Sequence, residues 1–153
     1  MTKTGSSTLL LSLGDRESRV RLTGEDGVSR EFVLALGLDA MTPGPFRRDP
    51  PTPLELEQAI MVVEDVLMPL AAHVPPHPLV ELHSPVPLAE GLGSHELSRE
   101  SIERLFGQLV AMVEGDPLAS AQLPRDRRFA AALLILREWM HHLDAGSVAL
   151  VDQ

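Results

Sequence analysis

The sequence predicts a single α/β domain, in which an antiparallel meander of three strands is extended by parallel strands and covered by helices. Its 153 residues are enough for one domain with a sizeable core. Short apolar or alternating runs fill residues 8–38, whereas apolar spacings of three and four dominate the later chain. The stretch Arg125–Val151 is expected to form the central helix that covers the sheet, followed by a strand. Its apolar stripe is too wide for a surface helix, and an apolar run follows it.

The meander is predicted from three short strand patterns joined by polar turns. In the second strand, Val20 and Leu22 alternate with Arg19 and Arg21, which indicates one buried face and one exposed face. The turns are short, so consecutive strands should pair antiparallel. The strands are expected at Thr8–Leu13, Ser18–Thr23 and Glu31–Leu38.

A proline-rich connection, Met41–Pro53, leads into the first helix. Thr52 is the expected N-cap, Pro53 takes the first helical position and Glu55 completes a capping box. This helix is expected to end near Leu70, with its apolar series facing the core.

The remaining elements are a short strand, two helices and a last strand. Proline residues surround the short strand, and Gly146 separates the last helix from the last strand. The expected ranges are Leu79–Leu82, a helix capped by Ser98 and ending near Glu114, a helix beginning after Arg125, and Ser147–Val151. The resulting order, β-β-β-α-β-α-α-β, is the plan of a ribonuclease H-like domain, which is also each half of an actin-like ATPase. Residues 1–7 are expected to be a disordered tail and residues 8–153 the domain.

The amino-acid composition limits which partners and which location are expected. The net charge of −9 disfavours nucleic acid, and the arginines at Arg47–Arg48 and Arg125–Arg128 are interpreted as solvated ends of elements. No apolar run approaches the ~18 residues of a membrane span, and the N-terminal run is too short for a signal peptide. Cysteine is absent, so neither disulfides nor thiol catalysis are expected. A cytoplasmic location follows as the default expectation.

Several stretches together resemble the second half of the catalytic core of the exopolyphosphatase and guanosine-pentaphosphate phosphatase family. The stretch Ser12–Arg19 stands where that family has Asp-Ile-Gly-Gly-Gly-Ser-Thr-Glu, and Val33–Leu38 fits its next apolar strand. The approach Asp49–Glu57 matches a proline-bearing helix start, and Ser101–Val151 follows the family's order of elements. The resemblance implies an actin-like half-domain and a phosphate-binding loop between the first two strands.

The departures from the family point away from catalysis. Only Gly14 remains of the loop glycines, although glycines are what let backbone amides approach a phosphate closely. Asp15 and Glu17 would add negative charge there, Ser12 replaces the family's metal-holding Asp, and Arg19 replaces its Glu. The second loop is expected at His83–Pro87, which has no glycine. The family's first half, with its catalytic glutamate, has no counterpart in this sequence.

The candidate site is therefore a degenerate phosphate or nucleotide loop without catalytic or metal-binding residues. Arg19, with Arg21, is the best candidate for holding an anion, although a solvated strand face explains both arginines. Asp15 and Glu17 are either a metal-binding pair or a polar turn. The six histidines do not have the spacing of a metal site. The candidate residues are Ser12, Gly14, Asp15, Arg16, Ser18 and Arg19.

Three functions remain open on the sequence. The preferred hypothesis is a catalytically inactive half-domain that acts through self-association, as a homodimer, or through another protein interaction. The alternative is a weak phosphohydrolase, or a protein that binds a phosphate-containing ligand or nucleotide, with its site completed by a second chain; Mg²⁺ would be its cofactor. The third is a regulatory partner of a full-length phosphatase. No cofactor, nucleic acid or membrane is expected for the preferred hypothesis.

Overall fold

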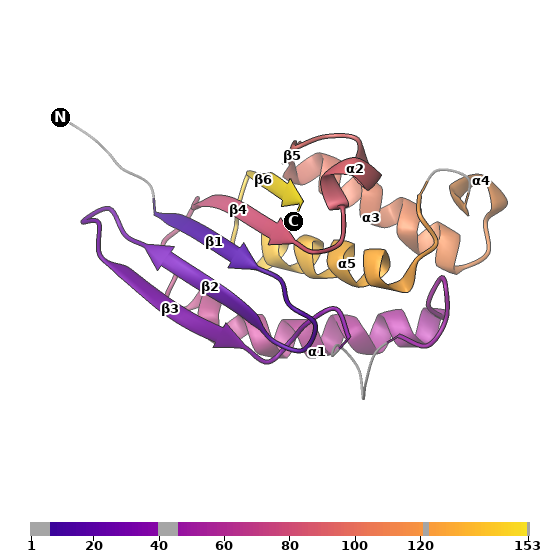
Figure 1. Ribbon diagram of the computed structural model, residues 1–153, viewed down its shortest axis with the longest axis horizontal. Coiled ribbons are helices and arrows are strands. Elements are labelled where there is room, and N and C mark those ends of the chain that lie inside the picture. Colours follow the sequence, from indigo (N-terminus) through magenta and orange to yellow (C-terminus); the bar gives the residue numbers. More distant parts are fainter. Residues whose placement is uncertain (1–6, 40–45, 121–122, 153) are drawn as a thin grey trace.

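A computed structural model describes residues 7–39, 46–120 and 123–152 of the chain. Its centre is one six-stranded sheet in the order β3-β2-β1-β4-β6-β5 (Figure 1). The strands are β1 (Thr8–Ser12), β2 (Ser18–Thr23), β3 (Ser29–Leu34), β4 (Leu79–Ser84), β5 (Glu96–Ser98) and β6 (Ser147–Asp152). The helices are α1 (Pro53–Ala71), α2 (Leu88–Leu92), α3 (Arg99–Val113), α4 (Pro117–Ser120) and α5 (Arg127–His142).

The sheet is mixed, as the sequence predicts. β1 pairs antiparallel with β2, and β2 pairs antiparallel with β3, which makes the expected meander. β1 also pairs parallel with β4, and β4 pairs parallel with β6. Short β5 closes the far edge antiparallel to β6. The predicted fold class, a ribonuclease H-like α/β domain, is confirmed.

One face of the sheet carries the core. The longer helices α1, α3 and α5 lie on this face, and α5 contacts both of the others (Figure 1). Leu9, Leu11, Val20 and Leu22 point toward this layer and are buried. Nearly every residue of α5 from Phe129 to Met140 is buried, so the predicted central covering helix is confirmed.

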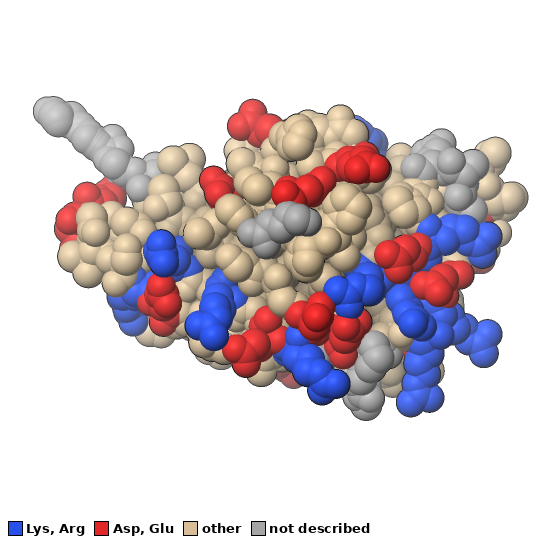
Figure 2. All heavy atoms as spheres, viewed as in Figure 1, with Lys and Arg blue, Asp and Glu red and all other residues tan. Residues whose placement is uncertain are grey.

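None of the long helices among the described residues covers the opposite face of the sheet (Figure 1), which is called the bare face below. Figure 2 shows this face with uncharged residues across its middle, basic groups below and to the right, and acidic groups scattered over it. Its side chains are the outward set of each alternating strand, such as Leu10, Arg21, Leu79 and Glu81. Sheets with parallel strands are normally covered on both faces, so an uncovered face of this kind marks a surface that can receive a partner.

Several predicted boundaries differ from the structure. The third strand ends at Leu34 instead of Leu38, because residues 35–38 leave the sheet to pack against the β1–β2 turn. The sequence analysis missed α2, β5 and α4, which are short and therefore show little periodicity. Residues 1–6 of the expected tail lie outside the described residues, whereas Ser7 is buried and its carbonyl accepts a hydrogen bond from Leu79.

The start of α1 is the capping box that the sequence predicts. Thr52 Oγ1 accepts a hydrogen bond from the Glu55 amide, and Glu55 accepts from the Thr52 amide at 3.0 Å. Glu55 also accepts from the Arg47 amide at 2.8 Å, which anchors the incoming chain. Burial acts to raise the pKa of Glu55, but these hydrogen bonds outweigh it and lower the pKa below its usual 4.5.

We expect the Glu55→Gln variant to lose part of the acid sensitivity of folding. A lowered folded-state pKa stabilises the protein above pH ~4.5 and loses that contribution as the pH falls through the folded value. Gln has no charge and can accept only one of the two backbone hydrogen bonds that Glu55 accepts. The variant should therefore be less stable at neutral pH, but its free energy of unfolding should fall less steeply between pH 5 and about pH 3. Urea denaturation at each pH measures this, with exposed Glu57→Gln as the control. Equal slopes in wild type and Glu55→Gln would contradict the prediction.

Among the described helices, none combines the length and the apolar character needed to cross a membrane.

Candidate functional site

The β1–β2 turn is closed by its own side chains. The Gly14 amide donates to Ser18 Oγ at 3.3 Å, and the Ser18 hydroxyl donates to the Leu36 carbonyl at 3.0 Å. Ser18 is 1% exposed, so this hydroxyl holds the turn from inside. A Cβ at Gly14 would lie 2.2 Å from the Glu17 carbonyl oxygen. The glycine is therefore required by the tight turn, and its amide is already used.

The segment after β3 packs directly onto this turn. The Leu38 amide donates to the Gly14 carbonyl at 2.9 Å, and the Asp39 amide donates to the Asp15 carbonyl at 2.7 Å. A Cβ at Gly37 would lie 2.5 Å from backbone atoms of Asp15, so only glycine allows this approach. The amides of Leu38 and Asp39 therefore donate to carbonyls of the turn and are not free to bind an anion.

Arg128, near the start of α5, joins the two segments. Its guanidinium donates to Asp15 at 2.7 Å and to Asp39 at 2.5 Å, and its side chain is 33% exposed. The hydrogen bond to Asp15, with that to Asp39, raises the pKa of Arg128 above its usual value, although burial acts in the opposite direction. The cation therefore already has two carboxylates around it, and these would repel a phosphate.

The other predicted site residues lie apart from this cluster. Ser12 ends β1 on the bare face, where it is paired in register with Arg19 of β2. Arg19 is exposed and forms an ion pair with Glu17 at 3.6 Å. Arg16 is exposed in the turn. The structure thus brings Gly14, Asp15 and Ser18 together as a closed turn, while Ser12, Arg16 and Arg19 face solvent or the bare sheet.

A second candidate anion position follows β4, where α2 begins. The Ala89 amide donates to one carboxylate oxygen of Asp152 at 2.9 Å, and the Glu90 amide donates to the other at 3.1 Å. Before the helix, the Val86 amide donates to Ser84 Oγ at 3.1 Å. Asp152, at the end of β6, therefore supplies the negative charge that helix-start amides attract.

The acid pair considered in the sequence analysis is also divided. Asp15 pairs with Arg128, whereas Glu17 pairs with Arg19 on the far side of the turn. Each carboxylate has its own arginine, which is the arrangement of a polar turn.

Sequence reasoning missed three residues that define both positions: Arg128, Asp39 and Asp152. Arg128 was interpreted as part of a solvated helix end, but it links two segments that are distant in sequence. Its position next to the N-cap Asp126 gave no indication of these partners. For Asp152, the sequence offers one signal, which is an acidic residue directly after an apolar strand. In the fold this residue lies next to the start of α2.

The sheet topology and the helices on one face define the class: a ribonuclease H-like α/β domain. A scan against protein-family models finds no match, and neither does a search of curated proteins. Solved structures do match in fold. The Aquifex aeolicus PPX-GPPA enzyme superposes with a TM-score of 0.68 at 14% identity, covering 97% of this chain and 54% of that one.

Two further structures agree with this result. An exopolyphosphatase-like protein superposes with a TM-score of 0.68 at 13% identity. The superposition covers 96% of this chain and 55% of that protein's chain. An exopolyphosphatase from Cytophaga hutchinsonii has a TM-score of 0.64 at 14% identity, with 96% and 53% covered. The chain thus spans about half the length of these proteins and resembles half of a Ppx/GppA phosphatase, as the sequence analysis expected.

Proposed function

We propose that this chain is a catalytically inactive, exopolyphosphatase-related half-domain that acts through self-association as a homodimer. One observation carries the first part of the proposal: the chain's own groups occupy three backbone amides at the two candidate phosphate positions. Ser18 takes the Gly14 amide, and Asp152 takes the amides of Ala89 and Glu90. A phosphate would have to displace a carboxylate that is already hydrogen-bonded in the second position, and would meet Asp15 and Asp39 at the first.

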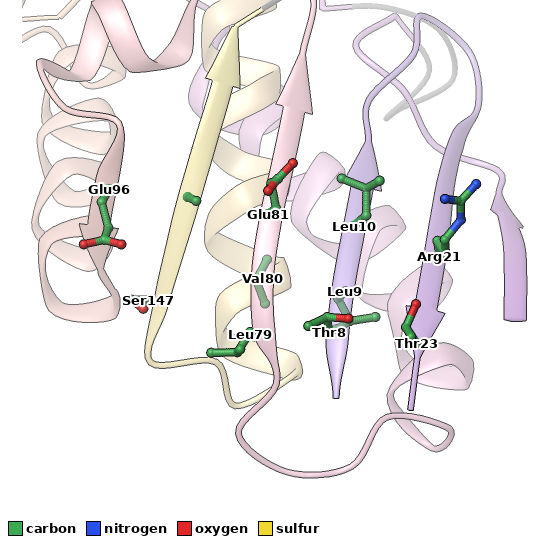
Figure 3. A pocket seen from close by; sticks show the side chains of 11 residues that line it. Thr8, Leu9, Leu10, Arg21, Thr23, Leu79, Val80, Glu81, Glu96 and Ser147 are labelled. Atoms are coloured by element: carbon green, nitrogen blue, oxygen red, sulfur yellow. The ribbon is translucent and has the colours of Figure 1, made fainter. Parts of the chain in front are cut away.

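The interface that we propose is the bare face of the sheet. A hollow of about 500 Å³ lies on it between β2 and β5, and Figure 3 shows Leu10, Arg21 and Glu81 on the side of the sheet away from the helices. The hollow is lined by Thr8, Leu9, Leu10, Arg21, Thr23, Leu79, Val80, Glu81, Glu96, Ser147 and Ala149. Apolar side chains lie exposed on the same face, with Leu79 at 60%, Val33 at 58% and Val151 at 37%.

The arrangement of charge on this face favours a second copy of the chain as the partner. The strand register aligns Arg21, Leu10, Glu81, Ala149 and Glu96 in one row across the sheet. Beyond Arg21 the row continues to Glu31 at the β3 edge, and on the other side of Leu10 it carries the acids Glu81 and Glu96. A twofold axis near the middle of the row would place Arg21 of one copy opposite the acids of its partner. In such an interface, Arg21 of each copy could approach an acid of its partner, while it pairs with Glu31 of its own chain at 3.1 Å.

We expect Leu79→Glu to prevent dimer formation. The substitution places a charge in the apolar part of the face and beside Glu81, so burying it against a second copy would be costly. Size-exclusion chromatography with light scattering should give twice 16.7 kDa for wild type and 16.7 kDa for the variant. Leu54→Glu on α1 is the matched control, because Leu54 is similarly exposed at 63% but lies away from this face. A monomeric wild type, or a Leu79→Glu variant that dimerises like wild type, would contradict the proposed interface.

The inactivity is tested separately by phosphate release from polyphosphate and from guanosine polyphosphates in the presence of Mg²⁺. We expect no turnover above buffer and no thermal shift with these ligands. Turnover that Arg128→Met or Arg19→Ala abolishes would support the weak phosphohydrolase instead.

A cytoplasmic location remains part of the proposal, supported by the absence of cysteine.

A further inference from the structure

A partly buried cluster of ligand-type side chains lies between α1 and α5, away from both phosphate positions. It consists of Glu64 on α1 with Glu138 and His142 on α5. Glu138 and His142 are four residues apart, so they project from the same face of their helix. About twelve residues separate this cluster from Arg128 along α5, which corresponds to ~18 Å of helix.

The atoms of this cluster approach each other without forming hydrogen bonds. His142 Nε2 lies 3.3 Å from Glu64 Oε2 and 3.3 Å from Glu138 Oε1. Both Nε2 and Glu138 Oε1 are buried and have no hydrogen-bond partner among the described residues. Glu138 is 0% exposed, so a carboxylate oxygen inside the protein is directed into this space unsatisfied. Such a group requires a cation or a donor.

From this geometry we propose that Glu64, Glu138 and His142 bind a divalent first-row transition metal, with Zn²⁺ as the best fit. Ligand atoms that are each ~2.0–2.1 Å from a tetrahedral ion are ~3.3–3.4 Å from one another. This matches both distances from His142 Nε2. One imidazole nitrogen and two carboxylate oxygens are ordinary zinc ligands, and water completes the fourth position. The two carboxylates balance the 2+ charge of the ion.

The surroundings of the cluster support a metal site. Arg137 donates to the other oxygen of Glu138 at 2.5 Å, which orients the carboxylate and leaves Oε1 free. Glu64 is 41% exposed and His142 is 19% exposed at the side chain, so an ion can enter from the solvent side. A bound ion would connect α1 and α5, the two helices that cover the sheet.

The competing explanation is a salt-bridge triad in which a protonated His142 lies between two carboxylates. The two explanations differ in what binds, so they can be separated by titration. Co²⁺ is a useful probe, because it takes zinc sites and its visible absorption reports tetrahedral coordination. The full chain, without a polyhistidine tag and treated with EDTA, would be titrated with Co²⁺ and then with Zn²⁺.

We expect one Co²⁺ per chain with a visible absorption band, loss of that band on adding one equivalent of Zn²⁺, and a higher melting temperature with Zn²⁺. His142→Ala and Glu64→Gln should each weaken Co²⁺ binding at least about tenfold. Glu64→Gln changes a partly exposed side chain, so it should keep the fold if His142→Ala does not. His141→Ala is the matched control: His141 is the neighbouring histidine, exposed and in contact with Arg99.

Two results would overturn the proposal. One is the absence of saturable Co²⁺ binding in wild type up to about 1 mM; the other is binding that His142→Ala and Glu64→Gln leave unchanged. Neither result bears on the interface or on phosphate turnover, so the metal site stands or falls independently of the proposed function.

Discussion

Arg137→Met is expected to destabilise the protein by about 3–5 kcal/mol at neutral pH, because it leaves the buried Glu138 carboxylate without its cation. In the wild type, Arg137 Nη1 lies 2.5 Å from Glu138, and Nε lies 3.2 Å from Glu103 of α3. Burial acts to lower the pKa of Arg137, but the hydrogen bond to Glu138 and the charges of both glutamates raise it above the usual value. The guanidinium also lies over the Phe106 ring, 5.1 Å from its centroid. Urea denaturation in the presence of EDTA measures the change.

The loss is attributed to the charge of Glu138, which the variant leaves buried without Arg137. Adding Glu138→Gln to Arg137→Met should recover part of the stability for the same reason. Arg99→Met is the control, since Arg99 pairs with Asp144 near the surface and an exposed pair contributes about 0–1 kcal/mol. If the two methionine variants lost equal stability, the cost would not come from a buried charge.

Trp139→Ala is expected to lower the free energy of unfolding by about 3–5 kcal/mol, because it removes the largest buried side chain of the core. Trp139 is 0% exposed and lies on α5, which packs against α1 and α3 as well as the sheet. Removing the indole leaves a cavity that the side chains packed around α5 can fill only in part by relaxing. Because Trp139 is the only tryptophan, far-UV circular dichroism must follow the unfolding.

Trp139→Phe provides the comparison. The indole Nε1–H is buried without a hydrogen-bond partner among the described residues, so removing it should relieve a desolvation cost. Phe also refills most of the space. We therefore expect the Phe variant to lose clearly less stability than the Ala variant, and equal losses in the two would show that packing around α5 is not the cause.

Most of the fold could be predicted because its elements have strong periodic patterns. α5 carries apolar residues on almost every side, and β2 alternates Val20 and Leu22 with two arginines. Thr52 and Glu55 signalled the start of α1 through a local motif that depends on residues three apart. The end of β3 was wrong because residues 35–38 are as apolar as a strand, and a tertiary contact of Gly37 with the turn decides their path.

The candidate site was less predictable for a physical reason. The missing loop glycines could be read from the sequence, but what replaces them depends on residues far apart along the chain. Arg128 reaches Asp15 across 113 positions, and Asp152 reaches Ala89 across 63. The cluster of Glu64, Glu138 and His142 was also not predicted, since only the packing of α1 on α5 places Glu64 beside the other two.

The position of β1 in the middle of the sheet has a consequence for how the chain assembles. β1 meets β2 across a short turn, but its parallel neighbour β4 begins only at Leu79. Closing so long a connection costs chain entropy before any pairing energy is gained, so the two halves of the sheet should join late and slowly. Until they join, one edge of β1 has unpaired backbone groups, which makes the newly made meander the part of the polypeptide most exposed to misassociation.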